Sequence, residues 1–210
     1  MRRLSLTLLV LSLVFGLTGC GQKQNAAEAG LTIAKDGRIT SVLVDSFEKD
    51  YYDIGELQEM IQLEISEYNR EAGREGIKLE SLELQEGKCV AVLTYQSAED
   101  YAAYNEVPFF AGTVQEAMDA GVNLSVTLAE AGKDNTIGRA ELSAMQDSHL
   151  VVWYGDMPVT TPGKIRYYGE NLQILNSKKI VAEDSAAENN DQDGMKETEE
   201  PAGPFYLLYK

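Results

Sequence analysis

Two stretches with hairpin patterns enclose one stretch with helical periodicity, and this order constrains the fold more than any other feature of the chain. Residues 31–47 alternate apolar and polar positions on both sides of Asp36-Gly37, a pair that favours a tight turn because glycine accepts a positive φ. Residues 77–97 repeat the hairpin pattern around Gly87. Between them, residues 53–73 carry apolar side chains at helical spacing. This order predicts an antiparallel sheet with a long helix packed on it.

The helical stretch has recognisable ends as well as an apolar stripe. The stripe consists of Ile54, Leu57, Ile61, Ile65 and Tyr68, with Met60 beside it. Asp53, followed three residues later by Glu56, resembles a capping box, which supplies partners for the first free N–H groups of a helix. Gly73 or Gly76 can end the helix, since glycine is the usual residue just after a last helical turn.

Shorter elements are expected along the rest of the chain. Residues 98–121 predict two short helices interrupted near Pro108, because a proline disfavours helix in the residue before it. The further expectations are a strand over 122–128, a loop with a short helix over 132–147, a strand over 149–155 and two strands within 164–183 around Gly169-Glu170-Asn171. The fold class predicted is α+β: an antiparallel, hairpin-rich sheet with one long helix and a few short helices on one face.

Composition changes sharply near the C-terminus. Residues 183–202 are rich in acidic side chains and contain no aromatic residue, so they cannot bury enough apolar surface to offset the entropy of ordering. We expect a disordered loop there. The run PFYLLYK that follows is strongly apolar and predicts a final strand that returns to the sheet. The predicted single domain therefore comprises residues 31–182 together with 203–210.

The N-terminus has the pattern of an export signal. Arg2 and Arg3 precede an apolar stretch, Leu4 to Leu17, that is too short to span about 30 Å of hydrocarbon. The stretch ends in Leu-Thr-Gly-Cys at residues 17–20, which resembles the lipobox of bacterial lipoproteins. We therefore expect residues 1–19 to be a lipoprotein signal peptide.

This resemblance implies that Cys20 receives a diacylglyceryl group and becomes the first residue of the mature chain. Two acyl chains hold a protein on a bilayer for long times, whereas one binds only marginally. The resemblance thus implies a lipid-anchored protein on the outer face of the cytoplasmic membrane, with the bilayer as its first partner. Residues 20–30 would comprise the lipidated cysteine and a short flexible tether, because they are small and polar.

The charge balance argues against one class of partner. The chain has 18 basic and 34 acidic residues, a net charge of −16. Such a surface repels the phosphate backbone, so we expect no nucleic-acid partner.

The acidic segment contains a pattern similar to an EF-hand calcium loop, although its first position is Asn and a lysine stands where an apolar residue is usual. The pattern is Asn189, Asp191, Asp193, Gly194, Glu197 and Glu200. A run of acidic residues generates such spacings by chance, so we predict no metal site and no cofactor.

No catalytic constellation is recognisable. Cys89 and His149 are the only residues that could form a thiol–imidazole pair. Cys89 alternates with Ala91, Leu93 and Tyr95 on one face of an expected strand, where a buried cysteine behaves as a small apolar residue. His149 lacks the further ligands that a zinc site needs. We interpret both residues as structural and predict no catalytic residue.

Paired aromatic residues provide the candidate binding site. Exposed Tyr and Trp rings can stack on sugars or contact proteins, and we select Trp153, Tyr154, Tyr167 and Tyr168 as the binding residues. The alternative is that one member of each pair faces the core and the other the rim of a sheet. The function expected is a non-enzymatic binding module for an unknown protein or glycan. The alternatives are an envelope hydrolase that uses carboxylates and a structural accessory subunit of a membrane complex.

Overall fold

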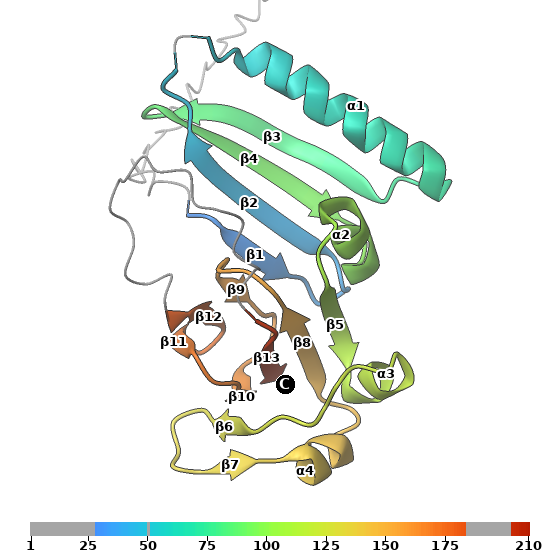
Figure 1. Ribbon diagram of the computed structural model, residues 1–210, viewed down its shortest axis with the longest axis vertical. Coiled ribbons are helices and arrows are strands. Elements are labelled where there is room, and N and C mark those ends of the chain that lie inside the picture. The colour runs from blue at the N-terminus through green and yellow to red at the C-terminus, as the bar shows by residue number, and fades with distance from the viewer. Residues whose placement is uncertain (1–27, 50, 184–202) are drawn as a thin grey trace, which may run out of the picture.

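The computed structural model describes residues 28–49, 51–183 and 203–210, and these residues form two β-sheets and four α-helices (Figure 1). The α+β class expected from the sequence is confirmed. The strands divide between two sheets rather than gathering in one, and the helices are shared between the sheets.

The larger sheet has seven strands and contains both predicted hairpins. Its strand order is β11 (Leu172–Asn176), β12 (Lys179–Ala182), β9 (Val159–Thr160), β1 (Gly30–Ile33), β2 (Ile39–Ser46), β4 (Lys88–Tyr95) and β3 (Ile77–Gln85). All neighbours are antiparallel except β1 and β9. Glu86 and Gly87 join β3 to β4 with φ values of 51° and 80°, as a tight hairpin turn with two positive φ angles requires.

The smaller sheet has six strands and is built around the C-terminal strand. Its order is β5 (Phe109–Thr113), β8 (His149–Trp153), β13 (Phe205–Tyr209), β10 (Ile165–Tyr168), β6 (Leu128–Glu130) and β7 (Thr136–Ile137). All five residues of β13 are buried, because Phe205, Leu207 and Tyr209 belong to one core cluster while Tyr206 and Leu208 belong to a second. The predicted return of the final strand to a sheet is therefore confirmed.

Four helices accompany the sheets: α1 (Ile54–Ala72), α2 (Ala98–Asn105), α3 (Val114–Asp119) and α4 (Arg139–Ala144). The long helix α1 lies along β3, at the opposite end of the molecule from α4 (Figure 1). The Asp53 side chain accepts hydrogen bonds from the N–H groups of Gly55 and Glu56 at 2.7 and 3.1 Å. Gly73 ends the helix in the left-handed conformation, with φ of 67°. Both predicted ends of this helix are confirmed.

One face of the seven-stranded sheet carries much of the core. The register places Ile33 of β1, Ile39 of β2 and Tyr95 of β4 in one row across this face. The same core cluster contains Ile65 of α1 and Trp153 of the six-stranded sheet. Helix α1 and the second sheet therefore pack on the same side of the larger sheet.

Several local predictions differ from the structure. The strand expected over 122–128 is wrong: the ladder begins only at Leu128, although Leu124 is buried. The two helices expected in 98–121 are present, but β5 lies between them. Residues 164–183 contain three strands, not two, and the first belongs to the other sheet. The short helix expected in 132–147 is confirmed as α4.

Other predictions concern residues outside the described ranges. These include the signal peptide 1–19, Cys20, most of the tether 20–30, and the acidic segment 183–202 with its calcium-like pattern, of which only Glu183 is described. At the described end of the tether, Glu28 forms an ion pair of 2.7 Å with Lys179 of β12. Within the described residues, no helix combines the length and apolarity needed to cross a membrane.

Candidate binding groove beside helix α1

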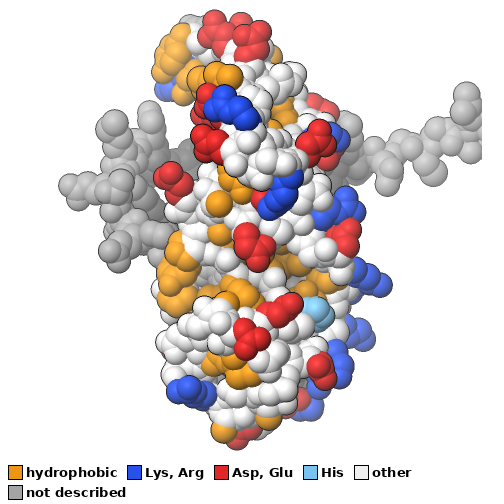
Figure 2. Space-filling model, turned by 90° about the vertical axis from the view of Figure 1, so that its right-hand side faces the viewer, with side chains coloured by type: hydrophobic (Ala, Val, Ile, Leu, Met, Phe, Trp, Pro, Cys, Tyr) orange, Lys and Arg blue, Asp and Glu red, His pale blue; other side chains and the backbone are white. Residues whose placement is uncertain are grey.

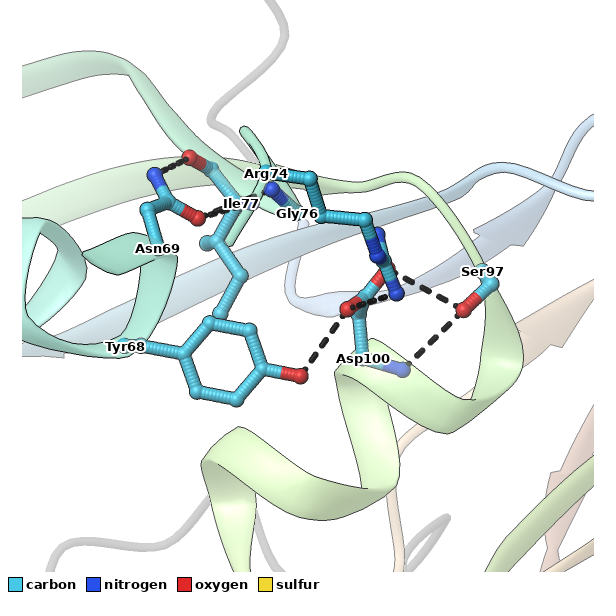
Figure 3. Close-up of polar contacts among 7 residues, drawn as sticks. All are labelled: Tyr68, Asn69, Arg74, Gly76, Ile77, Ser97 and Asp100. Carbon is cyan, nitrogen blue, oxygen red and sulfur yellow. Dashed lines mark hydrogen bonds and ion pairs between the residues drawn. The ribbon is translucent and has the colours of Figure 1, made fainter. Parts of the chain in front are cut away.

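The C-terminal end of α1 is held in place by a buried carboxylate, Asp100 of α2 (Figure 3). Arg74 donates two hydrogen bonds of 2.7 Å, Nη1 to Oδ2 and Nη2 to Oδ1. The Tyr68 hydroxyl donates to Oδ1 at 2.9 Å, and the Ser97 hydroxyl donates to Oδ2 at 3.0 Å. Asp100 is completely buried, so these bonds replace the water that its carboxylate has lost.

Asn69 joins the same end of α1 to the start of β3 (Figure 3). Its Oδ1 accepts from the backbone N–H groups of Gly76 and Ile77 at 2.8 and 3.0 Å, and its Nδ2 donates to the Ile77 carbonyl oxygen at 2.9 Å. Residue 76 has no room for a side chain, since a Cβ there would lie 2.6 Å from Oδ1 of Asp100. The helix end, the strand and α2 are thereby fastened together.

The environment of Asp100 favours its ionised form. Burial by itself would raise the pKa of this carboxyl, but the hydrogen bonds from Arg74, Tyr68 and Ser97 outweigh burial and hold the pKa below its ordinary value. The same contacts raise the pKa of Arg74, first through its hydrogen bond to Asp100. We interpret this cluster as a structural fastening, because every oxygen of the carboxylate is already engaged.

The N-terminal half of α1 buries fewer of its apolar side chains than the C-terminal half does. Of the predicted apolar stripe only Ile65 is buried, at 8 % exposure, while Leu57 and Ile61 are half-buried. Met60 and Leu63 are 58 % and 60 % exposed. The stripe therefore continues along the helix beyond the point where the sheet covers it.

An open groove of about 810 Å³ lies beside this half of the helix, and we call it the α1 groove. It is bordered by the end of β2, the first turns of α1 and the floor of β3 and β4. Its lining consists of Ala29, Leu43, Val44, Asp45, Ser46, Phe47, Tyr51, Tyr52, Asp53, Glu56, Leu57, Met60, Ile61, Leu82, Cys89, Ala91, Asp156 and Met157. Its size and largely apolar lining are typical of ligand sites in proteins.

The floor of the α1 groove contains Cys89, which the register places beside Asp45 of β2 and Leu84 of β3. The thiol is buried, as expected from the sequence. Burial raises its pKa, and the nearby Asp45 carboxylate raises it further. The thiol therefore stays protonated at neutral pH and is a poor nucleophile.

Aromatic side chains stand at one end of the α1 groove. Tyr52 contacts Phe47 and Tyr51, with ring centroids 4.9 Å apart in each pair. Tyr51 is 77 % exposed, and Tyr52 is also exposed. Rings of this kind offer a ligand a large apolar surface together with a hydroxyl group.

The charged residues that line the α1 groove are all acidic. They are Asp45, Asp53, Glu56 and Asp156, and no lysine or arginine is among the described lining residues. Lys49 and Lys88 are close in sequence and exposed, but they do not line the groove. On the face of the molecule that Figure 2 shows, acidic and basic side chains are interspersed. A ligand with positive charge therefore suits the groove better than one with negative charge.

The four aromatic residues selected from the sequence do not form an exposed patch. Trp153 is 1 % exposed and Tyr167 is also buried, because their strands lie within the six-stranded sheet. Tyr154 and Tyr168 are half-buried. The arrangement is the alternative named above, in which one member of each pair faces the core and the other lies nearer the surface.

Tyr154 does border a second, smaller hollow of about 520 Å³. Phe109, Phe110 and Tyr206 also line it, and none of its described lining residues is charged. It offers aromatic surface without the acidic rim of the α1 groove.

Cys89 and His149 are not brought together. Cys89 lies in the seven-stranded sheet, whereas His149 begins β8 of the other sheet and stacks on Tyr209, with ring centroids 5.1 Å apart. No group of three or more His, Cys, Asp or Glu side chains in the described ranges could hold a metal ion.

Sequence reasoning missed the residues that shape the α1 groove, especially Leu43, Tyr51, Tyr52 and Met60. One signal was available: Met60 and Leu63 lie beside the main apolar stripe, so the apolar face of the helix is wider than one sheet contact needs. The two tyrosines directly precede the helix cap at Asp53, where they lie next to that face.

The chain matches no protein-family model, no curated protein and no solved structure. What the protein does is therefore inferred from the groove itself.

Proposed function

We propose that this protein is a membrane-anchored, extracytoplasmic binding module that holds an apolar part of its ligand in the α1 groove. The observation that carries the proposal is the groove of about 810 Å³, with exposed Tyr51, Tyr52 and Met60 at its border. Isolated exposed apolar residues are common, but a contiguous set around a concavity is typical of an interaction site. The anchoring part of the proposal rests on the lipobox-like residues that end at Cys20.

Binding fits the groove better than hydrolysis does. A carboxylate hydrolase needs a carboxyl group whose pKa is raised so that it can act as a general acid. Within the described residues, the carboxyl groups with a displaced pKa are shifted downward: the Thr113 N–H lowers the pKa of Glu116, and a hydrogen bond from Lys133 lowers that of Glu130. Neither residue lines the groove.

A glycan-binding role is a second candidate, favoured by the hollow beside Tyr154. Its aromatic lining could stack on a sugar ring. Replacing Tyr154 by alanine should then abolish retention on a glycan that the native protein retains, while ligand binding in the α1 groove stays unchanged.

The test of the proposed function uses a neutral apolar dye, N-phenyl-1-naphthylamine, whose fluorescence rises on leaving water. The protein is the chain from Gly21, which keeps every buried apolar residue of the described core, and its near-UV circular dichroism and thermal unfolding are measured first. We expect saturable binding that Met60→Glu reduces at least tenfold, because the new charge lies at the groove.

Leu63→Glu is the matched control, since Leu63 is equally exposed on the same helix but does not line the groove. This variant should bind the dye as the native chain does. Dye binding that is absent, or that both substitutions reduce equally, would contradict the proposed function.

A further inference from the structure

Strand β2 has an open edge beside the α1 groove. Strand β1 pairs only with Ile39–Val42 of β2, whereas β4 pairs with β2 along its whole length, from Ile39 to Ser46. Over residues 43–46, no strand within the described ranges pairs with β2 on the side of β1. An open strand edge presents N–H and C=O groups that a further strand can pair with.

Strand β1 begins at Gly30, whose pairing with Val42 is the last on this side of β2. Gly30 has a φ of 156°, and a Cβ there would lie 3.0 Å from the Pro158 carbonyl oxygen, which accepts a hydrogen bond from the Leu31 N–H at 2.8 Å. Just before it, Glu28 pairs with Lys179 of β12. Because β12 lies on the far side of β1 from β2, the Glu28 side chain reaches away from β2. Ala29 lines the α1 groove but pairs with no residue of β2, so the ladder between the two strands stops at Gly30 and Val42.

The direction of the backbone groups follows from one observed hydrogen bond. The Phe47 N–H donates to the Gly87 carbonyl oxygen of the β3–β4 turn, at 2.8 Å. Because these groups alternate in direction along a strand, those of Val44 and Ser46 point to the open edge. The Ser46 N–H donates a hydrogen bond to the Asp45 carboxylate at 2.7 Å. Val44 is therefore the main residue whose backbone groups can pair with an added strand.

The edge and the groove are parts of one surface. Side chains alternate between the two faces of a strand, yet all five consecutive residues from Leu43 to Phe47 line the α1 groove. The groove therefore reaches around the strand edge rather than facing only one side of the sheet. A strand added to this edge would place alternate side chains toward Leu57 and Met60 of α1.

We propose that the ligand of the α1 groove is an extended peptide segment of a partner protein, with alternating apolar and basic residues, that adds as a strand to the β2 edge at residues 43–46. This inference rests on the proposed function and names the chemistry of its ligand. The open edge supplies main-chain hydrogen bonds, the groove receives the apolar side chains, and the acidic residues of its lining favour a peptide of net positive charge. The pairing length of four residues is short, so we expect micromolar affinity.

The test uses the full-length lipidated chain in lipid nanodiscs and a fluorescent nine-residue peptide of alternating leucine and lysine, followed by anisotropy. Empty nanodiscs measure binding to lipid alone. Two further peptides carry backbone N-methyl groups, one on every leucine and the other on every lysine. In an added strand, only one of these alternate sets of N–H groups points to β2. We therefore expect one methylated peptide to bind at least tenfold more weakly and the other to bind nearly as well as the parent.

Protein variants test the same contact from the other side. Val44→Pro removes the N–H that faces the open edge and leaves the β4 ladder intact, and it should weaken binding at least tenfold. Val44→Ala loses the same side chain but keeps the N–H, so its effect should be at least fivefold smaller. If Val44→Pro does not fold, the methylated peptides still show whether the peptide binds by strand addition.

Charge is tested separately. Asp45→Asn together with Asp156→Asn should weaken binding of the leucine–lysine peptide severalfold, and a leucine–glutamate peptide should not bind the native chain.

Three outcomes would overturn strand addition. They are equal binding of the two methylated peptides, an affinity no higher than for empty nanodiscs, and saturation of the groove by a second copy of this chain. Dye binding in the groove without peptide binding would overturn this inference and leave the proposed function standing.

Discussion

The two ends of helix α1 are held in opposite ways, although one continuous apolar stripe runs through both. At the C-terminal end, Arg74 and Tyr68 bond to a fully buried Asp100, and Asn69 fastens the helix to β3. At the N-terminal end, Leu57 and neighbouring residues border an open groove instead of a packed core. A helix fixed at one end can keep an apolar surface accessible at the other without losing its position.

The largest effect is expected on removing the buried carboxylate. Asp100→Ala would leave Tyr68, Ser97 and Arg74 without their shared partner, and we expect a loss of about 2–4 kcal/mol in the free energy of unfolding. Arg74 is half exposed and can regain water, which keeps the loss near the lower end of that range. Urea unfolding measures it. Glu99→Ala, an exposed neighbour on the same helix, is the control and should change stability by less than about 0.5 kcal/mol.

Truncation along the stripe compares the two ends directly. Ile65→Ala removes a side chain from the packed end and should cost about 2–3 kcal/mol. Leu57→Ala removes a half-buried side chain at the groove and should cost less than about 1 kcal/mol. Thermal unfolding of the two variants provides the measurement. Equal costs would mean that the helix is held uniformly along its length.

The contribution of Asp100 should depend on pH in a defined direction. Its pKa is lowered from the ordinary value of 3.8 in the folded state, so the unfolded chain takes up the proton first as the pH falls. The stabilisation is therefore complete well above pH 3.8 and is lost as the pH falls through the folded pKa. The difference in unfolding free energy between the native chain and Asp100→Asn should narrow between pH 6 and pH 3. A difference that stays constant over this range would contradict the assignment.

A local effect is expected at the helix cap beside the groove. Asp53→Ala removes the acceptor of the Gly55 and Glu56 N–H groups, a change that usually costs about 1 kcal/mol. Because this end can open locally, we expect faster hydrogen exchange in the first turn with little change in the global melting temperature. Exchange at Ile65 should stay unchanged. Faster exchange along the entire helix would show that its two ends unfold together.

Local patterns predicted local structure well. The hairpin turns at Gly37 and Gly87, the caps at Asp53 and Gly73 and the final strand all follow from residues close together in the chain. The β11–β12 hairpin was missed because no glycine marks its turn. The Asn176 side chain makes that turn instead, accepting from the N–H groups of Lys178 and Lys179 at 2.9 and 3.1 Å.

Other features depend on contacts between distant segments of the chain, and the sequence does not show which segments meet. The alternation over 122–128 indicates which side chains face inward, and Leu124 is indeed buried, but alternation does not show whether a neighbouring strand pairs with the segment. The parallel contact between β1 and β9 joins residues more than 120 positions apart. The α1 groove depends on where the pairing of β1 with β2 stops and on how far the sheet extends under α1. Both are tertiary facts, so the sequence alone placed the candidate site on Trp153 and Tyr167 instead.

The central position of β13 has a consequence for how the protein is made. The strands that flank it, β8 and β10, have both been synthesised by residue 168, yet they are held apart until residues 205–209 are inserted between them. The six-stranded sheet therefore cannot close, and apolar side chains such as Val151 and Ile165 stay uncovered by β13, until some forty more residues have been synthesised. The sheet closes only as the last strand arrives.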